Sequence, residues 1–218
     1  MSIKKAVFFI LLFSVQWHSQ AQNQIDFRGM PQSLVDFRFN QHSSLTFIGN
    51  SLFMNDFHQL GFIFIDFGYK YRLTKSFGIN VNYRALSRRQ LNDNYLTRNL
   101  NYFDLDYGKS MNRLSLGATF RVQNEWIPNK RPIIYNRSKI NLKYRLSYYW
   151  QPFTEIEVFT PLLHPTRDQP DQFRLAFGIN YNFNEKCKLE TYYQIRKLTN
   201  RIANNTYHVF SINFSYKL

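Results

Sequence analysis

Cysteine, proline and glycine are scarce in this sequence, and so are acidic side chains. Cys187 is the only cysteine, so no disulfide can form within one chain, and stability must come from other interactions. The chain has only 7 Pro and 8 Gly but is 18% aromatic, which is not the composition of a disordered segment. Beyond the first twenty residues no apolar run reaches 18 residues, so the sequence predicts no transmembrane helix.

The shortage of acidic residues leaves a large positive charge. The 28 Lys and Arg outnumber the 14 Asp and Glu, for a net charge of +14. Such an excess favours anionic partners, namely nucleic acid, lipid phosphate or lipopolysaccharide, but it carries no information about the fold.

The N-terminus has the three parts of a secretory signal peptide. Lys4 and Lys5 precede the apolar stretch 6–15 (AVFFILLFSV), and Ser19-Gln20-Ala21 supplies small residues before a cleavage site. Ten apolar residues cannot cross the ~30 Å of a bilayer core as a helix, so a membrane anchor is the weaker interpretation. We expect cleavage after Ala21, with a signal peptide over residues 1–21 and a single domain over 22–218.

The remaining sequence alternates between apolar and polar residues almost throughout. In the segment 172–183, Phe, Leu, Ile and Tyr fall on one parity, while Arg, Ala, Gly and Asn fall on the other. Such a two-residue period is typical of β-strands, and no segment has a helical period. The predicted strands are 33–40, 44–54, 61–73, 76–89, 99–109, 113–126, 138–150, 154–162, 172–183, 187–198 and 206–218.

Strand length and loop length both favour a membrane barrel. Many of the predicted strands are 10–13 residues long, whereas strands of soluble proteins cluster near 5–6 and tilted transmembrane strands need about 9–11. Short turns are expected at 74–75, 109–112, 151–153 and 184–186, and they alternate with longer loops at 55–60, 88–98, 127–137, 161–171 and 199–205. Short turns at one end and longer loops at the other are typical of outer-membrane barrels.

The two faces of the strands receive opposite assignments. We expect the aromatic face to meet lipid, with a girdle near the short turns formed by Tyr69, Tyr71, Tyr148, Trp150, Tyr181, Phe183, Phe214 and Tyr216. We expect the polar face to form a charge network in the lumen, made of Lys70, Arg72, Arg84, Arg121, Glu125, Lys143, Arg145, Glu155, Glu157, Arg174, Lys188, Glu190 and Arg196.

The sequence thus predicts an all-β fold: a closed, antiparallel, up-and-down transmembrane β-barrel. A membrane span must pair every backbone group, which forces closure. Eleven candidate strands cannot close a fully antiparallel barrel, so we expect 10 or 12: either 33–40 is not a full span, or 25–28 adds a strand. The alternative is a soluble periplasmic β-sandwich that binds an anionic ligand, in which the aromatic face packs against a second sheet.

Three segments resemble a known family. They are EIEVFTPL (155–162), DQFRLAFGINYNFNEKCKLETYYQIRK (171–197) and the tyrosine- and arginine-rich stretch GYKYRL…FGINVNYRALSR (68–88). Together with the closing strand they are similar to the family called domain of unknown function 2490, loosely over most of 61–218. That resemblance implies a bacterial outer-membrane barrel and no established activity or catalytic residue.

Candidate chemistry is sparse. Glu155 and Glu157 share a face and could form a carboxylate pair, but neutralising Arg145 and Arg174 on neighbouring strands is the simpler role. The histidines (His18, His42, His58, His164 and His208) have no metal-binding spacing, and no nucleotide-binding or nucleophile-elbow motif occurs. We therefore expect no cofactor, no metal and no catalytic residue.

Two further functions fit the sequence less well. An outer-membrane lipid hydrolase would need a Ser and a His together, and the nearest candidates are His42-Ser43-Ser44, beside a short turn, and His208 with Ser211, which have opposite parity. Nucleic-acid binding would need aromatic and basic side chains in one groove, yet here they lie on opposite faces.

We therefore expect a non-enzymatic, monomeric barrel in a Gram-negative outer membrane. It would be a structural barrel, a narrow passive pore or a surface-binding platform. Its partners would be outer-membrane lipid, lipopolysaccharide and, during biogenesis, the barrel-assembly machinery. Loop cations expected to meet lipid phosphate are Arg88, Arg89, Arg98, Lys130, Arg131, Arg137 and Arg201.

Overall fold

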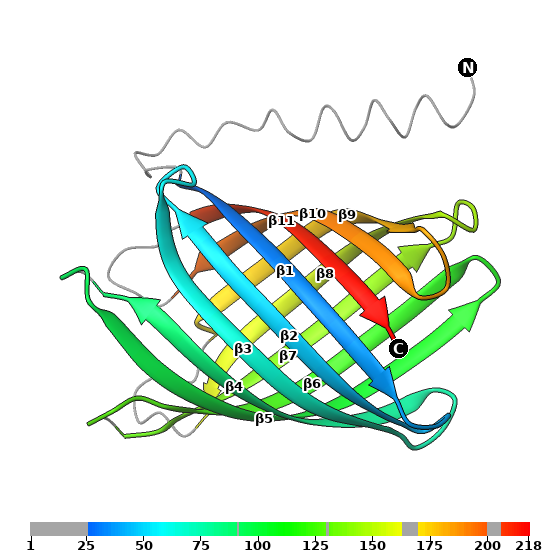
Figure 1. Ribbon diagram of the computed structural model, residues 1–218, viewed down its shortest axis with the longest axis horizontal. Coiled ribbons are helices and arrows are strands. Elements are labelled where there is room, and N and C mark those ends of the chain that lie inside the picture. Colours follow the sequence, from blue (N-terminus) through cyan, green and yellow to red (C-terminus); the bar gives the residue numbers. More distant parts are fainter. Residues whose placement is uncertain (1–25, 91, 130, 163–169, 200–205) are drawn as a thin grey trace.

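A single closed β-barrel makes up the computed structural model, which describes residues 26–90, 92–129, 131–162, 170–199 and 206–218. Its eleven strands follow one another around the barrel, tilted steeply against its long axis (Figure 1). The described residues contain no helix that is long and apolar enough to span a membrane. The strands are β1 (Asp26–Arg38), β2 (Ser43–Met54), β3 (Gln59–Arg72), β4 (Phe77–Arg89), β5 (Tyr95–Met111), β6 (Leu114–Trp126), β7 (Ile133–Tyr144), β8 (Trp150–Leu162), β9 (Gln172–Asn182), β10 (Cys187–Leu198) and β11 (Thr206–Lys217).

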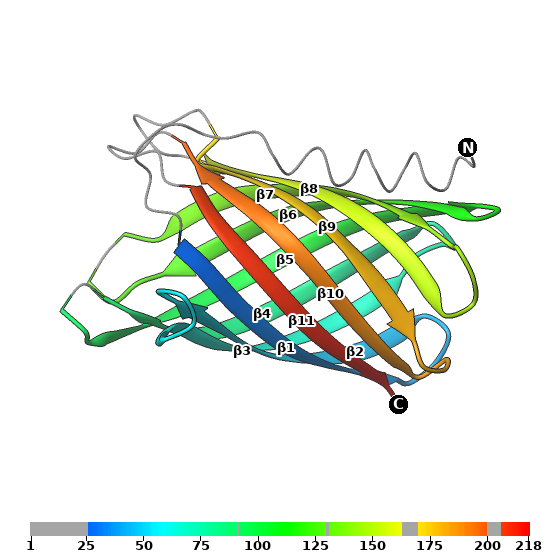
Figure 2. The same ribbon diagram turned by 90° about the horizontal axis from the view of Figure 1, so that it is seen from above.

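The strand count differs from the expected 10 or 12. Ten neighbouring pairs are antiparallel, but β1 and β11 pair in parallel, from Asp26↔Tyr207 to Asp36↔Lys217. Figure 2 shows β1 lying beside β11 along this seam. In an up-and-down barrel with an odd number of strands, the first and last strands run in the same direction, so parallel pairing closes the barrel without a further strand.

The N-terminal strand was divided wrongly by the sequence pattern. Residues 26–38 form one strand, whereas 25–28 and 33–40 were considered separately. Pro31 lies between them and interrupts the alternation. It is accommodated because Met30 and Pro31 have no partners in β2, while both pair along β11. Proline cannot donate to a ladder, so a gap on one side of it is expected.

The barrel is polar inside and apolar outside. Ile63, Ile65 and Phe67 are about half exposed on the outer face, while Asp66 between them is 1% exposed. Strand β11 repeats the pattern: Phe210, Ile212 and Phe214 are exposed, and Ser211 is fully buried. The aromatic face therefore packs against no second sheet, which excludes the soluble sandwich.

Connections are short at one end of the barrel, with turns at 39–42, 73–76, 112–113, 145–149 and 183–186. At the other end the connections span 55–58, 90–94, 127–132, 163–171 and 199–205. We call these the turn end and the loop end. The predicted sorting is present, although 55–58 is as short as a turn.

Four of the turns share one hydrogen-bonding pattern. The side-chain oxygens of Asn40, Thr74, Ser147 and Asn184 each accept hydrogen bonds from the backbone amides two and three residues later. The residue before each of them donates its amide to the carbonyl four residues on. Such side chains replace backbone partners in tight turns.

The turn between β7 and β8 lies at 145–149, not at the expected 151–153. Apolar residues alternate through Tyr144, Leu146, Tyr148 and Trp150, so the two-residue period continues across the turn and hides it. The Ser147 side chain marks the turn instead.

Candidate functional site

The candidate site is the lumen, where charged side chains from β3 to β10 form a belt. The belt consists of Asp66, Arg84, Tyr102, Asp104, Arg121, Arg137, Glu157, Arg174 and Arg196. These residues share the inward face of their strands, and the cross-strand register sets several of them directly opposite one another, including Asp66 and Arg84, Asp104 and Arg121, and Glu157 and Arg174.

On β3, β4 and β5 the belt is held by one carboxylate. Arg84 Nη2 donates to Asp66 Oδ2 at 2.6 Å, and the Tyr102 hydroxyl donates to the same oxygen. The Arg84 guanidinium lies 3.9 Å from the ring centroid of Phe64. Because Asp66 and Arg84 are direct cross-strand partners, this pair closes without distorting the sheet.

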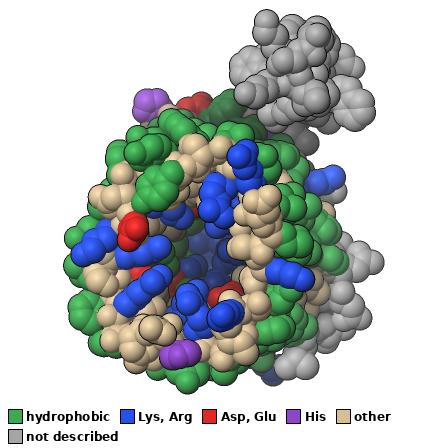
Figure 3. Space-filling view, turned by 90° about the vertical axis from the view of Figure 1, so that its right-hand side faces the viewer, with side chains coloured by type: hydrophobic (Ala, Val, Ile, Leu, Met, Phe, Trp, Pro, Cys, Tyr) green, Lys and Arg blue, Asp and Glu red, His purple; other side chains and the backbone are tan. Residues whose placement is uncertain are grey.

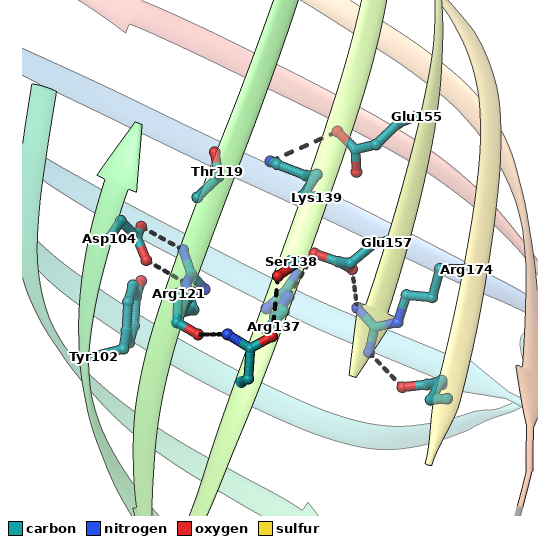
Figure 4. Close-up of polar contacts among 12 residues, drawn as sticks. Tyr102, Asp104, Thr119, Arg121, Arg137, Ser138, Lys139, Glu155, Glu157 and Arg174 are labelled. Carbon is teal, nitrogen blue, oxygen red and sulfur yellow. Dashed lines mark hydrogen bonds and ion pairs between the residues drawn. The ribbon is translucent and has the colours of Figure 1, made fainter. Parts of the chain in front are cut away.

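A bidentate pair continues the belt between β5 and β6. Arg121 donates from Nε to Asp104 Oδ1 at 2.6 Å and from Nη2 to Asp104 Oδ2 at 2.8 Å. The same guanidinium lies 3.8 Å from the ring centroid of Tyr102. Figure 4 shows this pair at one side of the network. Two parallel hydrogen bonds to a carboxylate fix the guanidinium in both position and plane.

Glu157 on β8 bridges two arginines. It accepts from Arg137 Nε at 2.5 Å and from Arg174 Nη1 at 3.1 Å (Figure 4). Both guanidiniums also lie against the ring of Phe159, at 4.8 and 4.1 Å from its centroid. One buried carboxylate thus serves two partly buried cations, which leaves the region positively charged.

Arg196 ends the belt without a carboxylate. It is 7% exposed and opposes Arg174 across the strand pair. Its Nε donates to Gln194 Oε1 at 2.5 Å, and its Nη2 contacts the Met30 sulfur at 3.2 Å. Among the residues that the structure describes, no carboxylate lies within ion-pair distance of it. In all, five belt arginines face three belt carboxylates.

Between β10 and β3, where the belt is absent, the strands β11, β1 and β2 carry an apolar cluster that we call the apolar wall. It consists of Met30, Leu52 and Val209, with Met54 and Phe62 packed against them. Val209 is fully buried and Leu52 is 3% exposed. Arg196 is the point of contact between this wall and the belt.

Lysines dominate the lumen towards the turn end. Lys139 Nζ lies 3.6 Å from Glu155 Oε2, and Lys188 Nζ lies 3.3 Å from Glu190 Oε2. Lys143 also points into the lumen, where it lines the cavity described below, and within the described ranges no acidic side chain pairs with it. Figure 3 shows the hollow at the turn end, with Lys and Arg side chains inside it.

A cavity of about 550 Å³ joins the belt, the apolar wall and these lysines. Its lining includes nine cations (Arg28, Arg84, Arg88, Arg121, Arg137, Lys139, Lys143, Arg174 and Arg196) and three anions (Glu155, Glu157 and Glu190). This volume lies within the ~300–1,000 Å³ typical of small-molecule sites. The excess of cations makes the cavity attractive to anions.

Most of the proposed network residues line the wall of the barrel. Arg84, Arg121, Arg174 and Arg196 belong to the belt, Glu125 pairs with Arg98 at 2.7 Å, and Lys70 lies 4.0 Å from Asp106 at the turn end. Arg72 lies near Lys70, at the rim of the turn end.

The expectation for Arg145 was wrong. Arg145 follows β7 in the turn and donates to the carbonyl of Asn112, because β7 ends at Tyr144 rather than at residue 150. Glu157 consequently pairs with Arg137 and Arg174, and Glu155 pairs with Lys139, instead of either pairing with Arg145.

Several lumen residues escaped the sequence analysis. Asp66, Asp104 and Lys139 have the inward parity of recognised neighbours, so extending the alternation along each strand would have found them. Arg137 was assigned to a loop because β7 was started at residue 138; it lies inside the barrel.

Some of the cations expected in loops also lie in strands. Arg88 and Arg89 lie in β4 and Arg98 in β5, so only Arg131 remains as an exposed loop cation among the described ones. Lys130, Arg201 and His164 lie outside the described residues, as does the segment 1–21, for which a signal peptide is expected.

The expected girdle residues cluster at the turn end on the outer face. The rings of Trp150, Tyr181 and Phe183 contact one another in series, with centroids 4.6 and 4.9 Å apart, the first pair tilted and the second edge to face. Tyr69 is exposed near the end of β3, and Phe214 near the end of β11. The other three are Tyr71, Tyr148, which lies in the turn, and Tyr216.

The two residues of the hydrolase hypothesis point to opposite faces. Ser211 is buried in the barrel and donates to the Met30 carbonyl, while His208 stacks against Phe27 and Tyr193 outside. They form no dyad. Within the described ranges no group of His, Cys, Asp or Glu could hold a metal ion.

A closed barrel with an apolar exterior and a charged lumen defines the class of outer-membrane-type β-barrels. The chain matches the family described as "Protein of unknown function (DUF2490)" over residues 15–208, and it belongs to that family.

One solved structure supports the fold, and two others are similar to a lesser degree. The NanC porin is 15% identical, with a TM-score of 0.54, over 89% of this chain and 100% of that chain. OmpT of Vibrio cholerae is 10% identical, with a TM-score of 0.43, over 73% of this chain and 57% of that chain. The translocator domain of the autotransporter NalP from Neisseria meningitidis is 10% identical, with a TM-score of 0.39, over 73% and 70%. No curated protein matches the chain.

Proposed function

We propose that this protein is a non-enzymatic passive pore in a Gram-negative outer membrane, and that small anions pass through its lumen in preference to cations. One observation carries the proposal: the cavity has nine lining cations and three lining anions, and within the described residues no carboxylate pairs with Arg196, near the loop end of β10, or with Lys143, near the turn end of β7. A row of fixed positive charges along a narrow path attracts anions and repels cations.

The outer surface supports the proposed location. Apolar side chains cover the exterior, and aromatic rings gather at the turn end, as they do in barrels whose outer band meets lipid. Lipid and lipopolysaccharide are the proposed surface partners, the barrel-assembly machinery is the partner during biogenesis, and the protein is a monomer. The signal peptide over 1–21 would deliver it across the inner membrane.

Reversal potentials in planar bilayers test the proposal. Protein refolded into detergent, inserted into a bilayer and placed under a KCl gradient should give stepwise currents with a reversal potential on the anion-selective side. Arg84→Glu and Arg174→Glu should each lower the ratio of chloride to potassium permeability by roughly twofold or more, because each reverses a charge inside the lumen.

Arg145→Glu is the matched control. It makes the same change of charge, but in a turn outside the lumen, so the permeability ratio should remain near that of the unchanged protein. A silent bilayer would contradict the pore, provided that the protein migrates differently on a gel before and after boiling. That shift shows that a closed barrel was present.

A further inference from the structure

In the lumen the charged belt on β3 to β10 lies next to an apolar cluster on β11, β1 and β2. Along the belt, Arg137 and Arg174 share the single carboxylate of Glu157, and Arg196 lies opposite Arg174. The apolar wall on β11, β1 and β2 lies next to Arg196, which contacts it at Met30. A channel for fully hydrated inorganic ions has no need of such a wall.

Arg196 is a lumen cation with unused capacity for hydrogen bonds to an anion. It is nine-tenths buried, its hydrogen-bond acceptors among the described residues are an amide oxygen and a thioether sulfur, and it opposes Arg174, another cation. A thioether is a weak acceptor, so a carboxylate that displaced the Met30 sulfur would gain a charge-assisted hydrogen bond. The same carboxylate would relieve the repulsion between the two guanidiniums.

The apolar wall lies directly beside the Arg196 guanidinium. Met30 contacts the guanidinium through its sulfur, and Leu52 and Met54 continue the apolar lining of the same cavity on β2. A ligand whose anionic group lies at Arg196 would therefore place its remaining atoms against methionine and leucine side chains. Polar hydroxyl groups at that position would lose their partners in water, whereas an apolar body would be favoured.

We infer that the lumen contains a binding site for small amphiphilic carboxylates, with the carboxylate at Arg196 and Arg174 and an apolar or aromatic body against the wall of Met30, Leu52 and Met54. The inference rests on the proposed anion pathway and deepens it by naming the class of solute.

Isothermal titration calorimetry on the full barrel in nanodiscs tests this site with three probes. Phenylacetate has both parts, acetate has only the carboxylate, and phenethyl alcohol has only the apolar body. Phenylacetate should bind at least about tenfold more tightly than either of the others. Equal affinity for acetate would overturn the role of the wall, and equal affinity for phenethyl alcohol would overturn the role of the arginines.

Variants assign the two halves of the site. Arg196→Gln should weaken phenylacetate binding about tenfold, because it keeps hydrogen-bonding capacity but removes the charge, whereas Arg145→Gln in the turn should leave it unchanged. Met54→Gln, at similar size, should reduce the advantage of phenylacetate over acetate, and Leu52→Asn should do so more strongly. Unchanged affinity in Arg196→Gln, with the heat-dependent gel shift intact, would overturn the site.

The titration separates this inference from the pore itself, since binding needs no current and chloride current needs no phenylacetate. A protein that conducts chloride but does not distinguish the three probes contradicts the amphiphile site alone. A protein that binds phenylacetate through Arg196 but never conducts supports the site and contradicts the pore.

Discussion

At the scale of single residues, two carboxylates inside the barrel each bind two partners, and this stabilises the buried charges. Asp66 serves Arg84 and the hydroxyl of Tyr102, and Glu157 serves Arg137 and Arg174. Aromatic rings add cation–π contacts to the arginines: the Phe159 ring lies against both of the guanidiniums that Glu157 bridges. Fewer acidic residues are then needed to keep the arginines buried, and the lumen retains its positive charge.

Glu157 should therefore be important for stability as well as for charge. In Glu157→Gln, Arg137 and Arg174 would face each other without their counterion, and we expect the free energy of unfolding to fall by about 3 kcal/mol. The measurement is the urea midpoint followed by the heat-dependent gel shift. The control Glu185→Gln lies in an exposed turn and should change stability by less than about 0.5 kcal/mol. Equal midpoints for the two variants would contradict a structural role for the bridge.

The sequence alone predicted which side chains face the lumen, but it did not predict their partners. Parity is local, so it separated inward from outward side chains in most strands. The partner of each charge depends on which residue of the next strand lies opposite, and that register is set by the turns. Placing the turn after β7 six residues late assigned Arg145 to the lumen, and starting β7 five residues late assigned Arg137 to a loop.

At the scale of elements, the short turns are the parts that fix the register. Each of the four similar turns depends on one side-chain oxygen that replaces two missing backbone partners. A polar residue at that position, rather than a break in the apolar period, marks the end of a strand. This signal would have placed the turn at Ser147 from the sequence.

Asn184 offers a test of the turn chemistry. Asn184→Ala removes the acceptor for the amides of Lys186 and Cys187, and we expect a loss of about 1 kcal/mol in unfolding free energy. Asn184→Asp keeps the acceptor and should recover most of it. The readout is again the urea midpoint, and an alanine variant as stable as the aspartate variant would show that the side chain is dispensable.

At the scale of the whole molecule, the fold class followed from strand length and from the two-residue period, and both are properties of the entire sequence. The strand number did not follow, because the sequence pattern contains no information about the direction in which the last strand meets the first. Pro31 made this harder by dividing β1 into two apparent segments.

Engineered disulfides test the parallel seam directly. Leu34 and Ser215 are register partners on β1 and β11 and share the inward parity. With Cys187 replaced by Ser, the pair Leu34→Cys and Ser215→Cys should cross-link on mild oxidation, since neighbouring strands lie ~4.8 Å apart. Leu34→Cys with Asn213→Cys shares the parity but is displaced by two residues, and it should stay reduced. The opposite result would show a different closure.

The parallel seam also constrains how such a barrel could change in size. Ten of its eleven pairings join strands that are consecutive along the chain, so any hairpin could be duplicated or deleted as a unit without disturbing the rest. Each such event changes the count by two and leaves β1 and its last neighbour running the same way. Variation by hairpins would thus yield wider or narrower cylinders that are all odd-numbered, and only gain or loss of a lone terminal strand could convert this lineage to an even one.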